Sequence, residues 1–137
     1  MSVPIDTTSP LVYDAGALVA AEKGSRRLLL LHTEALASGR EITVPSPVLA
    51  QVWRGDSRQA RLAWVLRGCQ IDPSDEEIAK QAGVLLGRSR TRDAIDAIVV
   101  ATAWKRRAGV VTSDPGDLRK LIETVEMDGH RIAIATV

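Results

Sequence analysis

The 137-residue sequence predicts a single α/β domain of three layers, with helices on both faces of a short, mainly parallel sheet of four or five strands. Short apolar segments alternate with helical segments along the whole chain. Parallel strands need such crossover connections, whereas antiparallel strands do not. The composition, 45% hydrophobic and 26% charged, is that of an ordinary globular protein. We therefore expect one domain over residues 1–137, with residues 1–10 forming a flexible or extended N-terminal segment.

The first half of the chain alternates short apolar strands with helices that end at glycines. Gly39, Gly55 and Gly68 stop three of the helices. Ser46 followed by Pro47 is typical of a helix start, with serine as the cap and proline at the first helical position. Strands are expected at Leu11–Tyr13, Ile42–Val44 and Cys69–Ile71, and helices at Ala15–Ala21, Arg26–Ser38, Val48–Arg54 and Arg58–Arg67.

The second half continues the alternation. Ser74 with Glu77 three residues later forms a capping box that opens a helix over Asp75–Leu86. The apolar run Asp93–Arg107 is compatible with a buried strand, but its length and alanine content favour a buried helix. Strands are expected at Val110–Thr112 and Arg131–Ala135, with a helix over Gly116–Val125 between them.

Charge and rare residues exclude several classes of protein. The net charge of +1 provides no strong cationic field, so any nucleic-acid binding must depend on local patches. The single cysteine, Cys69, excludes an internal disulfide and a cysteine-based zinc cluster. The first ten residues lack the pattern of a signal peptide, and the longest apolar stretch is far shorter than the roughly 18 residues that span a membrane. We expect a cytoplasmic protein without a membrane segment.

Two aspartates follow predicted strands directly. Asp14 ends the strand Leu11–Tyr13 inside an apolar segment, and Asp114 follows the strand Val110–Thr112. A buried carboxylate must be hydrogen-bonded, paired or bound to a metal, because an isolated one is costly. Each aspartate also has a structural interpretation: Asp14 as a helix cap, and Asp114, before proline, as a turn or helix start.

Two further aspartates open the buried helix. Asp93 and Asp96 are three positions apart and so share a helix face. Asp93 suits the N-cap, whereas Asp96 lies among apolar residues and favours a functional role. Asp117 is either another site acid or a first-turn acid favoured by the helix dipole.

These acids are predicted to meet at one edge of the sheet. Neighbouring carboxylates raise each other's pKa unless a cation neutralises them. Mg²⁺ and Mn²⁺ prefer hard oxygen ligands and also bind phosphate oxygens. The pattern therefore indicates metal-assisted hydrolysis of phosphodiester bonds. A nucleotide-binding α/β module is the rival class, but no strand precedes a glycine-rich phosphate loop.

Two segments resemble the PIN-domain family, and in particular VapC-like toxins. LVYDAGAL is similar to the first PIN strand, and DAIVVATAWKRRAGVVTSDPGDL is similar to the PIN helix and the strand that ends in T-x-D. The resemblance implies a PIN-like three-layer fold and a ribonuclease that depends on Mg²⁺ or Mn²⁺. In it, Asp14, Asp96 and Asp114 match the acidic metal cluster, Asp117 and Asp93 are additional acids, and Ser113 helps to orient the cluster.

One position departs from the family pattern. PIN domains usually carry a glutamate on the helix after the second strand, and here VPSPVLAQVWRG has Gln51. A glutamine carbonyl can bind a metal or orient water, but it adds no negative charge and cannot act as a base. The alternative function is therefore a weak or silent PIN-like domain that binds RNA or a protein without cutting.

The resemblance also implies partners: an RNA substrate, a small antitoxin protein and a second copy of the chain in a homodimer. RNA would need cations near the acidic site. The tryptophans Trp53, Trp64 and Trp104 are interpreted as core or interface residues rather than base-stacking platforms. Two sets of arginines are candidates for RNA contacts, although each is also compatible with an ordinary solvated face: Arg88, Arg90 and Arg92, and Arg54, Arg58 and Arg61.

Overall fold

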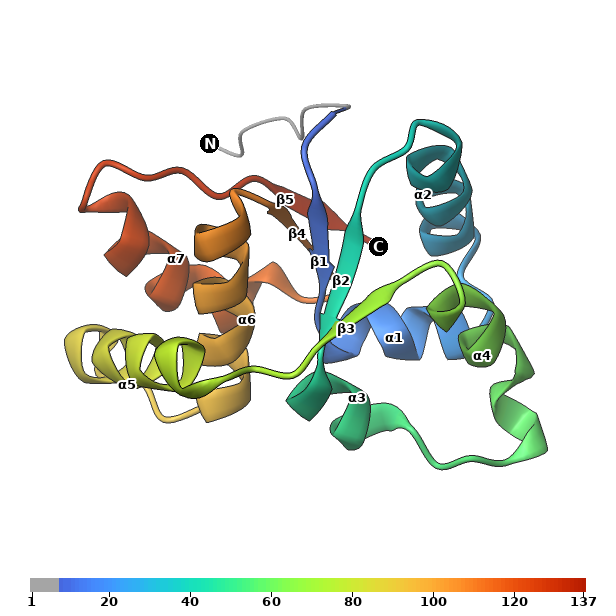
Figure 1. Ribbon diagram of the computed structural model, residues 1–137, viewed down its shortest axis with the longest axis horizontal. Coiled ribbons are helices and arrows are strands. Elements are labelled where there is room, and N and C mark those ends of the chain that lie inside the picture. The colour runs from blue at the N-terminus through green and yellow to red at the C-terminus, as the bar shows by residue number, and fades with distance from the viewer. Residues whose placement is uncertain (1–7) are drawn as a thin grey trace.

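A five-stranded, fully parallel sheet lies at the centre of the computed structural model, which describes residues 8–137 (Figure 1). Residues 1–7, and with them most of the expected N-terminal segment 1–10, lie outside the described residues. The strands are β1 (Leu11–Tyr13), β2 (Ile42–Pro45), β3 (Gln70–Asp72), β4 (Gly109–Thr112) and β5 (Ile134–Thr136). The predicted three-layer α/β/α class with a parallel sheet is confirmed.

The order of the strands is β3-β2-β1-β4-β5, so the first strand occupies the middle. The chain builds outward from β1 to β3 on one side and then returns to add β4 and β5 on the other. Leu11 pairs with Ile42 of β2 and with Gly109 of β4. The direction of building therefore reverses between β1 and β4, and in open parallel sheets ligands bind beyond the carboxyl ends of the strands at such a reversal.

Helices cover both faces of this sheet (Figure 1). One face is covered by α6, which contacts β1, β2 and β4, with α5 and α7 packed beside it. The other carries α1, which contacts β1 and β4 and packs against α2, α3 and α4. The α-helices are α1 (Ala15–Glu22), α2 (Arg26–Ala37), α3 (Ser46–Val52), α4 (Ala60–Leu66), α5 (Glu76–Ser89), α6 (Ala94–Arg106) and α7 (Arg119–Glu126). The ambiguous run after residue 93 is thus a helix, as its length and alanine content predict.

Two predicted helix starts are wrong by one residue. α3 begins at Ser46 directly after β2, so Pro45 precedes it and no side chain caps it. No loop separates strand from helix, which leaves Ser46 no room to act as a cap. α5 is capped by Asp75, whose carboxylate accepts a hydrogen bond from the Ile78 amide at 3.1 Å. Ser74 adopts φ 55° and does not form the predicted capping box.

Two predicted helices are divided. The segment expected as Arg58–Arg67 is a 3₁₀ turn, η1 (Ser57–Gln59), followed by α4. The buried side chain of Gln59 turns back here to accept hydrogen bonds from the amides of Arg54 and Gly55, at 2.7 and 3.1 Å. The segment after β4 is likewise η2 (Pro115–Leu118) and then α7. The last strand is also shorter than predicted and begins at Ile134, where it pairs with Val110.

The three tryptophans do not fill the core. Trp53 is 42% exposed and Trp64 is 50% exposed, so their interpretation as core residues is wrong, and a role in an interface stays a prediction. Trp104 is half-buried and packs against the core.

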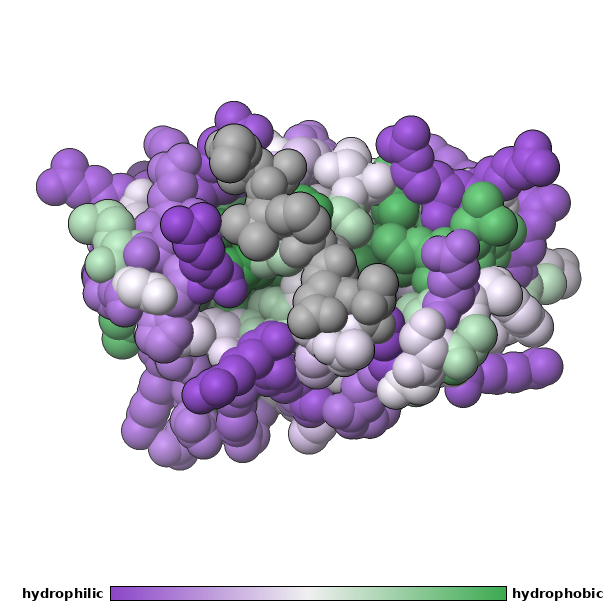
Figure 2. All heavy atoms as spheres, turned by 90° about the horizontal axis from the view of Figure 1, so that it is seen from above, coloured by the Kyte–Doolittle hydropathy of each residue, from purple (hydrophilic) through white to green (hydrophobic). Residues whose placement is uncertain are grey.

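Exposed hydrophobic side chains gather over α2, where Figure 2 shows them among charged groups; they include Leu30 and Leu36. Within residues 8–137, every helix is too short or too polar to cross a lipid bilayer.

Candidate active site

Asp14 stands where β1 ends and α1 begins, at the middle of the sheet. Its backbone amide donates a hydrogen bond to the Val111 carbonyl of β4 at 3.2 Å, which continues the pairing of the two strands. Its carboxylate is only 7% exposed and accepts a hydrogen bond from the Ala17 amide at 2.9 Å. Asp14 is therefore the N-cap of α1, yet this cap leaves a buried carboxylate at the reversal point of the sheet.

Thr112 connects Asp14 to the neighbouring loop. The threonine hydroxyl is hydrogen-bonded to the Asp14 carboxylate and accepts a hydrogen bond from the Asp114 amide at 3.1 Å. Ser113 lies against the start of α1, where a Cβ added to Gly16 would be 2.3 Å from the Ser113 hydroxyl oxygen, and its predicted role in orienting the cluster stays a prediction. Thr112 makes an orienting contact that was not predicted from the sequence. Its position beside Asp14 in the β1–β4 pair is the signal that could have identified it.

Asp93 and Asp96 lie at the start of α6. Asp93 is the N-cap, and its carboxylate accepts hydrogen bonds from the amides of Ile95 and Asp96 at 3.1 and 3.0 Å. Asp96 sits one turn into the helix and is half-buried. The structure therefore confirms the capping interpretation of Asp93, and it places the half-buried Asp96 side chain in hydrogen-bond contact with the Asp93 carboxyl group.

The acids influence one another electrostatically. Burial raises the pKa of Asp96 to about 7, assisted by the negative charges of Asp93, Asp14 and Asp117. Burial also raises the pKa of Asp14, and the charge of Asp117 adds to this, while hydrogen bonds from Thr112 and two backbone amides oppose it. Four carboxyl groups from β1, α6 and η2 are therefore close enough to act on each other.

Asp114 has a different environment from Asp117. Its carboxylate accepts a hydrogen bond from the Gly116 amide at 3.0 Å and caps η2. The largest charge effects on Asp14 and Asp96 include that of Asp117 and not that of Asp114. Both side chains are exposed. The charge of Asp117 therefore acts on Asp14 and Asp96, whereas the carboxylate of Asp114 caps the loop after β4.

The chemistry of this acidic group suits a hard divalent cation. Its polar atoms are carboxylate oxygens, and burial, together with the neighbouring negative charges, raises the pKa of Asp14 and Asp96. A bound cation would favour the charged forms of these groups. Among residues 8–137, however, no three His, Cys, Asp or Glu side chains are close enough together to enclose an ion. Mg²⁺ is commonly held by one or two carboxylates together with waters and substrate phosphate, and such an open arrangement fits these acids.

Gln51 projects from α3, which contacts both α1 and α6. Its side chain is exposed, and its backbone carbonyl accepts a hydrogen bond from the Arg54 guanidinium at 3.0 Å. The helix that carries Gln51 thus packs against the two helices that carry Asp14 and Asp96 at their starts. Gln51 thus belongs to a helix beside the acidic group, and its side chain carries no charge.

The candidate arginines differ in their freedom to meet RNA. The guanidinium of Arg54 is occupied by carbonyls at the end of α3, and that of Arg88 forms a two-point ion pair with Asp128 at 2.8 and 3.2 Å. Arg58 and Arg61 are exposed but belong to η1 and α4, so the predicted spacing with Arg54 does not make one helical face. Arg90 and Arg92 are also exposed, and they lie in the loop immediately before Asp93.

Sequence reasoning missed Gln59. Its side chain is buried, donates hydrogen bonds to Glu22 at 2.6 Å and to the Val52 carbonyl at 2.8 Å, and accepts two from the adjoining loop. This amide joins the end of α1 to the loop between α3 and α4. A glutamine in a polar stretch carries no sequence signal for such a role.

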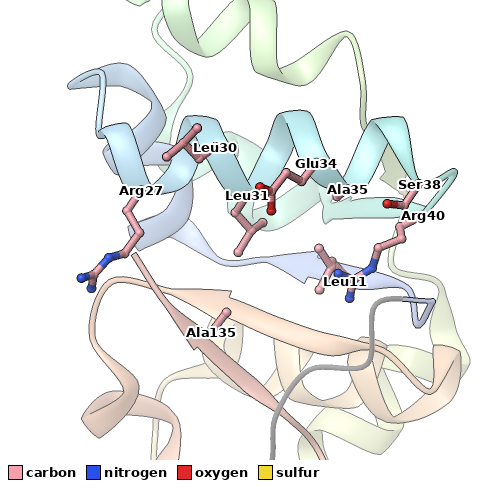
Figure 3. Close-up of a pocket in the computed structure, with 9 residues that line it drawn as sticks. All are labelled: Leu11, Arg27, Leu30, Leu31, Glu34, Ala35, Ser38, Arg40 and Ala135. Carbon is pink, nitrogen blue, oxygen red and sulfur yellow. The ribbon is translucent and has the colours of Figure 1, made fainter.

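A groove between α2 and the sheet is distinct from the acidic group. It has a volume of about 410 Å³. Figure 3 shows Leu11 and Leu31 facing its interior, with Arg27 and Arg40 near its two ends. None of the five aspartates lines this groove. The candidate site is therefore the acidic edge of the sheet.

Comparisons with known proteins agree with this geometry. The family model described as PIN domain matches residues 11–122. No curated protein matches the chain. A solved structure of VapBC2 from Rickettsia felis, bound to a DNA fragment from its promoter, is similar with a TM-score of 0.69 and 16% identity, covering 93% of this chain and 98% of that one.

Two further solved structures share the fold. A toxin–antitoxin complex from Klebsiella pneumoniae has a TM-score of 0.62 and 21% identity, covering 78% of this chain and 88% of that one. A protein from Pyrobaculum aerophilum has a TM-score of 0.55 and 15% identity, covering 85% of this chain and 86% of that one. At these identities the similarity establishes the fold alone.

Proposed function

The chain belongs to the PIN domain family, and on this basis we propose that it is a metal-dependent ribonuclease and the toxin of a toxin–antitoxin pair. The observation that carries the proposal is the group of mutually repelling carboxylates at the carboxyl edge of the parallel sheet. Structural acids are normally arranged to avoid such repulsion. A group of carboxylates that repel one another is therefore a candidate functional site.

We propose that Asp14, Asp96 and Asp117 hold Mg²⁺ or Mn²⁺, with Asp93 at the border of the site. A bound divalent ion would polarise the RNA phosphodiester and activate water. The chain's own contribution is orientation: Thr112 and the Ala17 amide fix the Asp14 carboxylate, and the α6 start holds Asp96. Arg90 and Arg92 would attract the RNA backbone towards this otherwise repulsive edge.

The proposed partners follow from the similar structures. Two of them are described as VapBC or toxin–antitoxin assemblies, and by analogy a small antitoxin would bind this chain. A homodimer is also proposed, since exposed Leu30 and Leu36 provide apolar surface. Co-expression with the product of a neighbouring small gene, followed by size-exclusion chromatography, would test both partners.

The experiment that tests the enzyme is cleavage of a panel of structured RNAs by the purified chain. Cutting is expected with Mn²⁺ or Mg²⁺ and none with EDTA. A second candidate function, RNA or protein binding without cleavage, is favoured by the uncharged Gln51 beside the acids. A folded chain that binds RNA in the presence of Mn²⁺ but never cuts it would support this second function.

Asp117→Asn is expected to lower the cleavage rate by about 10²-fold, because it removes a charge that acts on both Asp14 and Asp96. Asp114→Asn is the matched control. Asparagine keeps the side-chain oxygen that accepts from Gly116, so its rate should fall less than about tenfold. Single-turnover cleavage at saturating Mn²⁺ measures both variants. The reverse ranking would assign the metal-binding role to Asp114.

Gln51→Glu is expected to tighten Mn²⁺ binding about tenfold, since it adds a carboxylate to a site that depends on charge for affinity. Glutamine and glutamate have the same shape, and the position is exposed, so the fold should be unaffected. Isothermal titration with Mn²⁺ gives the affinity. Gln81→Glu, on helix α5, provides the control with the same added charge. Equal effects of the two variants would mean that Gln51 is not part of the site.

A further inference from the structure

A cationic pocket lies at the C-terminal end of α6, where this helix meets the loop that leads into β5. Its volume is about 350 Å³, close to the lower end of the range of about 300–1,000 Å³ for small-molecule sites. α6 has 13 residues and therefore extends about 20 Å from the end that carries Asp96. The pocket is thus separate from the acidic site. It is lined by Ala103, Trp104, Arg107, Gly129, His130 and Arg131.

The positive charges of this pocket are not neutralised. Neither Arg107 nor Arg131 forms an ion pair with another of residues 8–137. No acidic side chain lines the pocket. The nearest acid along the chain, Asp128, is bound at two points by Arg88, which lowers the pKa of Asp128. Two arginines and a histidine therefore line one small pocket that contains no acidic residue.

An aromatic wall completes the pocket. The ring of Trp104 lies 5.0 Å from that of His130 between centroids, tilted by 57°. Trp104 is half-buried and packs against the core, which fixes its position. Guanidinium groups recognise phosphate through paired hydrogen bonds, and nucleic-acid bases stack on indole rings. The pocket thus offers both kinds of contact that a nucleotide needs.

Arg107 occupies a backbone conformation that favours glycine. Arg107 ends α6 in the left-handed region at φ 54°, and the Ala108 amide closes the turn on the Ala103 carbonyl at 2.9 Å. Glycine is the preferred residue in this turn, because a side chain costs about 1 kcal/mol in that conformation. The chain carries an arginine here, and its guanidinium lines the pocket.

We infer that this pocket binds a nucleotide, with Arg107 and Arg131 on the phosphate and the base against Trp104. The ligand is a free nucleotide or one unit of an RNA strand. The inference does not depend on the proposed ribonuclease activity, because none of the five aspartates of the acidic site lines the pocket.

The test is isothermal titration of the purified chain with adenosine monophosphate, inorganic phosphate and adenosine in EDTA. Without metal, the acidic site repels phosphate, so binding reports the pocket. The monophosphate should bind more tightly than either fragment. Arg107→Gly should weaken that binding about tenfold, since it removes a charged hydrogen-bond donor. Glycine suits φ 54°, so thermal unfolding of this variant should be unchanged or shifted upward.

Arg131→Gln should weaken monophosphate binding to a similar degree, and Arg67→Gln is the control. Arg67 is an exposed arginine at the end of α4, outside the pocket, so its replacement should alter affinity less than twofold. A six-residue oligoribonucleotide separates the two sources of ligand: binding at least tenfold tighter than the monophosphate, and still sensitive to Arg107→Gly, assigns the pocket to an RNA strand. Equal affinities assign it to a free nucleotide. No binding at millimolar monophosphate, or equal binding by all three variants, would overturn the inference.

Discussion

Asp96→Asn is expected to reduce metal-dependent RNA cleavage by about 10²–10³-fold while the fold stays intact. Holding a divalent ion against the reacting phosphate contributes several kcal/mol to the transition state, and each 1.36 kcal/mol is about a factor of ten in rate. Asp96 is the acid on which the most other carboxylates act, and it is half-buried at the start of α6. Asparagine preserves its shape and removes the charge that would bind the metal.

The measurement is single-turnover cleavage with Mn²⁺, with circular dichroism as the check of folding. Asp14→Asn should give a loss of the same order. Asp75→Asn is the matched control, because Asp75 is the N-cap of α5 and is not one of the acids of the candidate site. Asparagine at this position can still accept the hydrogen bond from the Ile78 amide. Wild-type rates in both Asp96→Asn and Asp14→Asn would show that the acidic group is not the catalytic centre.

The metal-free chain is expected to lose stability as pH rises through neutrality, and Asp96→Asn should remove most of that loss. Burial and neighbouring acids raise the pKa of Asp96 from 3.8 to about 7. A carboxyl group with a raised folded-state pKa favours the folded state fully below the unfolded pKa, and this advantage disappears as pH rises through the folded pKa. Because most of this advantage is lost between about pH 4 and about pH 7, and because the group is only half-buried, we expect a further loss of roughly 0.5 kcal/mol between about pH 6.5 and about pH 8.5.

Urea unfolding in EDTA at the two pH values measures this effect. Burial lowers the pKa of the His32 imidazole, so His32 makes stability rise slightly as pH rises past about 6.5, and this effect is the same in both proteins. Asp96→Asn should be more stable than the wild type at the higher pH, whereas saturating Mn²⁺ should stabilise only the wild type. A pH dependence that is identical in both proteins would place the repulsion elsewhere.

The fold could be predicted because the sequence patterns that indicate its strands and helices lie within single segments of the chain. Strand β1 and the long helices have clear apolar patterns, and the alanine-rich segment after Asp93 is long enough to exclude a strand. The start of α5, which was predicted wrongly, depends on hydrogen bonds with residues outside the helix. Asp75 replaces Ser74 as the cap because Asp72 already accepts a hydrogen bond from the Ser74 amide, at 2.8 Å, and turns the chain there.

The site was predictable in composition but not in arrangement. The positions of Asp14 and Asp96 after a strand and within an apolar helix distinguish them in the sequence. The sequence does not rank Asp114 against Asp117, since both follow β4 and both are compatible with capping. The structure separates them by their contacts, since Asp114 caps η2 and the charge of Asp117 acts on Asp14 and Asp96.

The central position of β1 has a consequence for protein synthesis. β1 is the first strand to leave the ribosome, yet one of its two neighbours, β4, comes near the end of the chain. Until β4 is translated, Asp14 lacks its Thr112 contact, and η2 with Asp117 does not yet exist. A nascent or prematurely terminated chain that stops before β4 therefore carries an incomplete acidic group. For a protein that would harm its own cell, this topology delays assembly of the acidic site until β4 and η2 have been translated.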